Sequence, residues 1–99
     1  MLNQIVLVGR ISKDIESFEN FAIMTLNVPR SYKNADGEFD IDSLPCVLWK
    51  GISSSVIEYC HAGDLVGIKG RLENKDNNIR VVAEKVTFLS NKKVEEGDL

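Results

Sequence analysis

The sequence lacks any apolar run long enough to cross a bilayer and has few residues suited to catalysis. The longest apolar stretches, such as residues 5–8 and 65–68, fall far below the roughly 20 residues that a membrane-spanning helix needs. The single histidine, His61, stands near Glu58 and Asp64 in a pattern typical of a solvated helix end, and no GxxxxGK[ST] phosphate loop occurs. No secretory signal pattern opens the chain. We therefore expect a cytoplasmic protein, associated with the nucleoid if it binds DNA, that is not an enzyme.

Cysteine and positive charge are also scarce. Cys46 and Cys60 are too far apart for a CxxC motif, and no other cysteine could complete a metal site. We interpret them as reduced thiols packed in the core, and we expect no metal and no cofactor. Lys and Arg number 12 against 15 Asp and Glu, giving a net charge of −3. Because phosphate binding depends on local cations, their distribution must decide whether nucleic acid is a partner.

The apolar pattern predicts five strands and one helix. Alternating or β-branched segments indicate strands over residues 3–11, 21–28, 41–49, 65–72 and 79–89. Ser55-x-x-Glu58 has the form of a capping box and predicts a short helix after the third strand, with Gly63 as its stop. Polar turn residues occupy 34–37 and 74–78. Pro29 predicts a bulge or an edge position because proline cannot donate a ladder hydrogen bond.

This order of elements predicts an all-β protein with one helix, namely the OB-fold. That fold is a five-stranded Greek-key barrel, here with the helix between strands 3 and 4, although other small barrels remain compatible with the pattern. At 99 residues the chain is long enough for one domain. We place that domain at residues 1–89 and expect residues 90–99, which are polar and charged, to form a mobile tail.

Several segments resemble the single-stranded DNA-binding proteins of bacteria and phages in matching order and spacing. They are MLNQIVLVGRISKD, TLNVPRSYKN, LPCVLWK, VIEYCHAGDLVGIKGRLE and VTFL, and together they cover about residues 1–89. The resemblance implies an OB-fold that binds single-stranded DNA without sequence preference in replication, recombination or repair. It also implies a homotetramer, with a dimer as the alternative, and no catalytic activity.

The resemblance assigns base stacking to two aromatic residues, Trp49 and Tyr32. Strand alternation separately places Trp49 opposite the core-facing Cys46 and Leu48. A place for this only tryptophan in the core or in a subunit interface is the alternative. The candidates for phosphate contacts are the basic residues that flank the predicted groove, although any one of them also fits a solvated surface. They are Arg10, Lys13, Arg30, Lys33, Lys50, Arg71, Lys75 and Arg80.

The sequence departs from this family at several places. Aromatic residues that the family commonly carries are absent at Ser43 and near Asn77, and the hairpin at residues 74–78 is short. The loop at residues 16–20 is acidic, which disfavours a DNA backbone. The chain ends in EEGDL without the Pro-Phe tip through which the family recruits replication and repair proteins. We therefore expect modest affinity and do not carry that recruitment over.

Two other functions remain open. One is an assembly factor similar to the primosomal replication protein, which bridges protein partners and binds DNA more weakly as a dimer. The other is an OB-fold that has lost DNA binding and only self-associates. In both the single-strand binder and the assembly factor, the first segment, MLNQIVLVG, is the strand through which two copies would pair.

Overall fold

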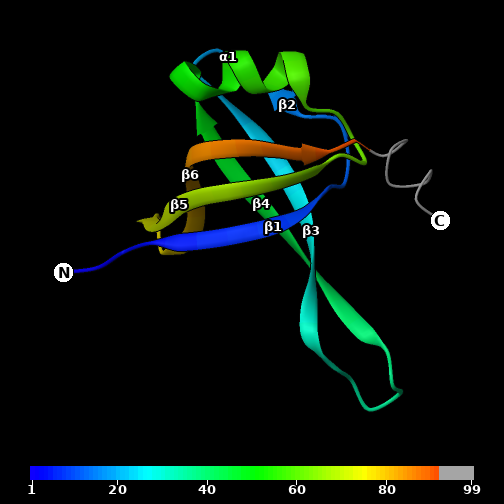
Figure 1. Ribbon diagram of the computed structural model, residues 1–99. Coiled ribbons are helices and arrows are strands. Elements are labelled where there is room, and N and C mark those ends of the chain that lie inside the picture. Colours follow the sequence, from blue (N-terminus) through cyan, green and yellow to red (C-terminus); the bar gives the residue numbers. More distant parts are fainter. Residues whose placement is uncertain (92–99) are drawn as a thin grey trace.

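The computed structural model describes residues 1–91 and contains every predicted element. In chain order the elements are β1 (Ile5–Ile11), β2 (Glu16–Ser17), β3 (Phe21–Lys33), β4 (Phe39–Trp49), α1 (Lys50–Tyr59), β5 (Leu65–Lys75) and β6 (Asn78–Ser90) (Figure 1). The two-residue β2 lies in a segment that was expected to be a loop. β6 continues through Ser90, and the rest of the predicted tail, apart from Asn91, lies outside the described residues.

The strands close into a barrel because β1 pairs on two sides. The sheet order is β1-β5-β6-β4-β3-β2, and a further pairing joins β1 to β3. That closing contact is short, with Arg10 opposite Asn27 and Ile11 opposite Leu26. β4 and β6 run parallel while the other pairs are antiparallel. Five long strands with a helix between β4 and β5 make this an OB-fold, which confirms the predicted fold class.

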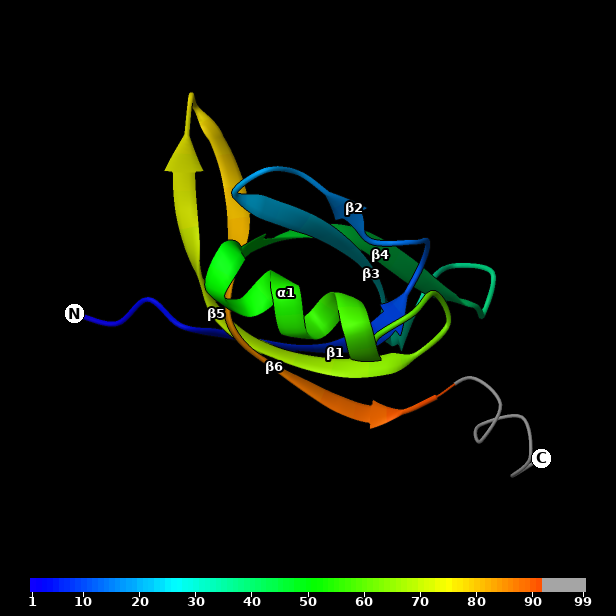
Figure 2. The same cartoon turned by 90° about the horizontal axis from the view of Figure 1, so that it is seen from above.

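The core lies inside the barrel and beneath α1, which crosses one end of it (Figure 2). Its largest fully buried side chains come from four strands and are Ile11, Met24, Leu26, Cys46, Leu48, Val66 and Ile68. Both cysteines are buried and free, as the sequence predicted. Burial raises the pKa of the Cys46 thiol to about 11, because a thiolate would lose its hydration there.

The helix begins earlier than the sequence indicated. α1 starts at Lys50, so Ser55 lies inside it and the predicted capping box is wrong. Trp49 is the N-cap residue and offers no side-chain cap. Instead, the Lys50 N–H donates to the Asn20 carbonyl at 3.0 Å, so a tertiary contact satisfies one of the free N–H groups. The helix ends at Tyr59, before the predicted stop at Gly63. No helix within residues 1–91 is long and apolar enough to span a membrane.

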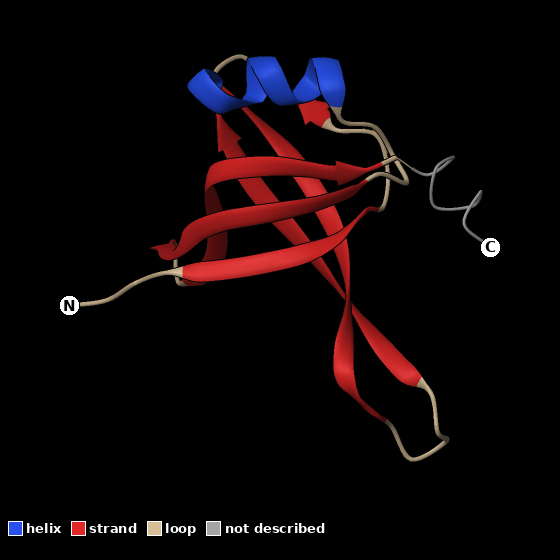
Figure 3. Ribbon diagram, in the orientation of Figure 1, coloured by secondary structure: helices blue, strands red, loops and turns tan. Residues whose placement is uncertain are grey.

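Two strand ribbons extend from the barrel: β3–β4, which reaches away from α1 in Figure 3, and β5–β6, which projects in Figure 2. The longer ribbon, β3 and β4, turns at residues 34–37 as predicted, with Gly37 at φ 79°. Its register shifts between Pro29 and Lys33, which confirms the predicted bulge. The β5–β6 ribbon has a shorter turn than predicted, because pairing continues to Lys75 opposite Asn78 and leaves only Asp76 and Asn77, both at positive φ.

Candidate nucleic-acid interface

Trp49 lies on the outer face of the barrel at the end of β4. Its side chain is 42% exposed, whereas Cys46 and Leu48 are fully buried on the inner face. This is the orientation that strand alternation predicted. Val47 shares the outer face with Trp49 but is buried, because it lies between Ile23 of β3 and Val82 of β6. The tryptophan is therefore an accessible residue directly after the buried run 46–48 of β4.

Two phenylalanines extend the aromatic surface from Trp49. Phe21 is directly opposite Trp49 in the β3–β4 register, and the two rings meet edge to face with centroids 5.7 Å apart. Phe18 stacks on Phe21 with centroids 4.8 Å apart and an angle of 16° between the planes. We call Phe18, Phe21 and Trp49 the aromatic row. Both ends of this row are open to solvent, since Phe18 is 50% exposed.

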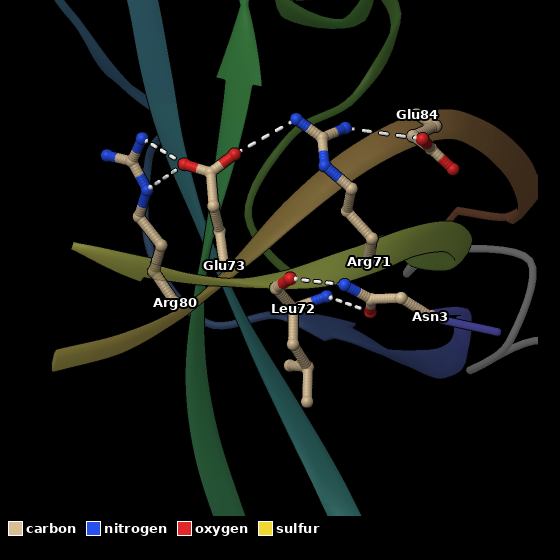
Figure 4. Close-up of polar contacts among 6 residues, drawn as sticks. All are labelled: Asn3, Arg71, Leu72, Glu73, Arg80 and Glu84. Atoms are coloured by element: carbon tan, nitrogen blue, oxygen red, sulfur yellow. Dashed lines mark hydrogen bonds and ion pairs between the residues drawn. The ribbon is translucent and has the colours of Figure 1, made fainter. Parts of the chain in front are cut away.

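An ion-pair chain joins Arg80, Glu73, Arg71 and Glu84 on the β5–β6 ribbon (Figure 4). Arg80 connects this chain to the aromatic row. The Arg80 guanidinium lies over the Trp49 ring, 5.6 Å from its centroid. Arg80 also donates to Glu73 Oε1, at 3.0 Å from Nε and 2.6 Å from Nη2. Glu73 Oε2 accepts a 3.0 Å hydrogen bond from Arg71, which in turn reaches Glu84 at 3.2 Å.

The two arginines change the acidity of Glu73. Hydrogen bonds from Arg80, and secondarily from Arg71, hold the pKa of the Glu73 carboxyl below its usual value. Glu73 is therefore charged at neutral pH and shared by both cations. Arg71 and Arg80, predicted to contact phosphates, are brought together near Trp49, but each is already paired with a carboxylate.

Tyr32 lies far from Trp49, near the tip of the β3–β4 ribbon, and is 63% exposed. Lys33 beside it has its ammonium 5.8 Å from the Phe39 ring centroid. Two nitrogens of Arg30 donate hydrogen bonds to the Asp42 carboxylate, at 2.9 and 3.2 Å. The Arg30 guanidinium also lies 3.7 Å from the Asp40 carboxylate. This pairing raises the pKa of Arg30 and lowers that of Asp42. Tyr32, Arg30 and Lys33 thus form a second group, separate from the aromatic row.

The four remaining basic candidates are dispersed. Arg10 donates to the Gly63 carbonyl at 3.0 Å, and Lys13 pairs with Glu16 at 3.3 Å. Lys50 follows Trp49 directly and Lys75 ends β5, and neither has an ion-pair partner within residues 1–91. Of these, only Lys50 is a chain neighbour of the aromatic row.

Sequence reasoning missed Phe18 and Phe21. Both flank the polar pair Glu19-Asn20, and their pairing depends on β2, which the pattern did not predict. The pattern that could have indicated an aromatic pair here is two aromatic residues, three positions apart, on either side of a polar pair. In the described part of the chain, no three His, Cys, Asp or Glu side chains gather as a metal site would require.

The fold and this surface define a class of protein: a small OB-fold domain with exposed aromatic rings flanked by arginines. The chain belongs to the single-strand binding protein family, whose model matches residues 2–94. Single-stranded DNA-binding protein B of Bacillus subtilis is 40% identical over 76% of this chain and 71% of its own length. Single-stranded DNA-binding protein 3 of Listeria innocua is 36% identical over 93% of this chain and 66% of its own length. This chain therefore spans about two thirds of those relatives.

A solved structure has the same fold. It is a dimeric structure of the N-terminal domain of the PriB protein from Thermoanaerobacter tencongensis, with a TM-score of 0.69. The match covers 90% of this chain and 98% of that one, at 23% identity. At that level of identity the similarity shows the fold alone, so the function has to be argued from the candidate site.

Proposed function

We propose that this protein binds single-stranded DNA without sequence preference and without catalysing a reaction, protecting the DNA in replication, recombination or repair. The observation that carries the proposal is the exposed Trp49 ring on the outer barrel face, with Arg80 beside it. An aromatic face stacks on any base, so stacking gives affinity without sequence readout. Nearby arginines supply the charge that a phosphate backbone needs. Family membership supports the same reading.

The DNA path would run between the two groups of candidate residues. Trp49 and Arg80 lie at one end of the β3–β4 ribbon, and Tyr32 and Lys33 lie near the other. Because Arg30, Arg71 and Arg80 are all engaged with carboxylates, phosphates must compete for them. We therefore propose binding of modest affinity that weakens as salt is raised.

The test is a titration with oligo(dT) that follows Trp49 fluorescence at several salt concentrations. Because Trp49→Ala removes the only tryptophan, its binding is followed by the anisotropy of labelled oligo(dT) instead. The substitution should weaken binding by about 1–3 kcal/mol, the usual contribution of one base stack. Tyr59→Ala is the matched control, because Tyr59 is 69% exposed but belongs to the end of α1. Circular dichroism should show both variants folded. Unchanged tryptophan emission and no DNA binding at low salt would refute the proposal and favour an assembly role.

We also propose that copies of the chain associate through β1, as a homotetramer or a dimer. Residues 5–9 pair with β5 on one edge, and no strand within residues 1–91 pairs with their other edge. Val6 and Val8 are 71% and 50% exposed on the outer face, and Val8 borders an open groove of about 510 Å³ with Pro29 and Ile41. Free strand edges beside apolar surface favour pairing.

Light scattering gives the subunit count. Val6→Lys should shift the protein toward the monomer, because it places a charge in the proposed interface. Ile79→Lys is the control, since Ile79 is equally exposed at 73% but lies on the β5–β6 ribbon. An unchanged mass for Val6→Lys would remove β1 from the interface.

A further inference from the structure

We propose that Phe18 is a further base-stacking residue, beside Trp49. This inference rests on the proposed DNA binding and extends it to a residue of the β1–β3 connection. The acidic character of residues 16–20 argued against DNA contact in this segment. The structure places an exposed aromatic ring there, in line with Trp49.

The backbone fixes the position of Phe18. β2 pairs with β3 directly before it, with Ser17 opposite Ala22. The Phe18 N–H then donates to the Phe21 carbonyl at 2.8 Å, closing a tight turn. In the same turn, the Asn20 carbonyl accepts a 3.0 Å hydrogen bond from the Lys50 N–H. The ring is therefore attached to a segment held on both sides rather than to a free loop.

Phe21 packs against one face of the Phe18 ring. It stacks on Phe18 at 4.8 Å and meets Trp49 edge to face at 5.7 Å, so it fixes the spacing between the two outer rings. Phe21 itself is half-buried, while Phe18 is 50% exposed. A ring that is already ordered loses little side-chain entropy when a base stacks on it. The aromatic row thus offers two prepared stacking positions, at Phe18 and at Trp49.

The surrounding charges favour a base over other occupants. Lys50 and Arg80 lie beside Trp49, so a phosphate backbone would follow that side of the row. Glu16 and Glu19 flank Phe18 and disfavour phosphate there. An uncharged base face is the part of DNA that such a position accepts. Phe18 would then compensate for the stacking aromatics that are missing at Ser43 and near Asn77.

A fluorescence reporter tests the contact directly. In the Trp49→Phe background, Phe18→Trp places the only indole of the chain at position 18. Oligo(dT) should quench its emission over the same concentrations at which anisotropy of labelled DNA reports binding. Binding seen by anisotropy with unchanged indole emission would overturn the role of Phe18 and leave the proposed function intact. Failure of the unmodified protein to bind oligo(dT) would instead refute the proposed function.

Affinity measurements separate stacking from packing. Phe18→Leu keeps an apolar contact with Phe21 but removes the aromatic face, so it should weaken binding at least about fivefold. The salt dependence should not change, because no phosphate contact is lost. Tyr59→Ala, an exposed aromatic outside the row, should bind as the unmodified protein does. Full affinity in folded Phe18→Leu would contradict the proposal.

Discussion

The carboxylate of Glu73 controls how much positive charge is available beside Trp49. It accepts hydrogen bonds from both Arg71 and Arg80, and its lowered pKa keeps it charged at neutral pH. A phosphate approaching the Trp49 surface therefore meets arginines whose charge is already matched. In the proposed complex, Glu73 would hold Arg80 near the indole and would compete with the DNA backbone for both arginines.

Replacing Glu73 with glutamine should tighten DNA binding severalfold. Glu73→Gln keeps the side-chain shape but removes the charge that engages two cations. If both arginines then contact phosphates, the slope of log K against log salt should steepen by up to about 1.4, or about 0.7 for each contact. Glu84→Gln is the matched control, since Glu84 pairs with Arg71 alone and should have a smaller effect. Equal or weaker binding by Glu73→Gln would show that orientation of Arg80 outweighs competition.

At the scale of elements, local pattern predicted the type of each element better than its ends. Alternation identified all five long strands because their inner residues fill one core. The start of α1 was missed because its first N–H is satisfied by Asn20, thirty positions earlier in the chain, and not by a local cap such as Ser55. Contacts of that kind depend on the closed barrel, so no window of sequence reveals them.

Gly70 is required where β5 and β6 change register. The register shifts between Lys69 and Gly70, and a Cβ at position 70 would overlap the carbonyl of Val82. Gly70→Ala should therefore lower the free energy of unfolding by about 1–3 kcal/mol, as overpacking does in other cores. Gly51→Ala is the control, because nothing lies within 4 Å of its Cβ and alanine favours the helix by about 0.5–1 kcal/mol. Urea denaturation measures both, and an unaffected Gly70→Ala would mean that the ribbon shifts to accept the methyl group.

At the scale of the whole molecule, the candidate site is assembled from strands that are distant in sequence. Motif resemblance identified Trp49 and Tyr32, and composition identified the basic residues. Neither could show that Glu73 would lie between Arg71 and Arg80, because that depends on the β5–β6 register. The sequence therefore indicated which residues carry charge, while the fold determines which of those charges are neutralised.

The two predicted stacking residues are separated by most of the β3–β4 ribbon, and this separation predicts how binding depends on DNA length. Phe21 opposite Trp49 begins β3, and Tyr32 lies near the end of that strand. At about 3.3 Å per residue the two positions are up to roughly 36 Å apart, too far for a very short oligonucleotide to reach both. Tyr32→Ala should weaken binding of oligo(dT) of about 16 nucleotides but leave binding of about 4 nucleotides unchanged. Trp49→Ala should weaken the binding of both oligonucleotides, since we expect the short and the long DNA alike to contact the aromatic row. Fluorescence anisotropy across a length series measures this, and an equal loss for Tyr32→Ala at every length would show that Tyr32 and Trp49 act at one place on the DNA.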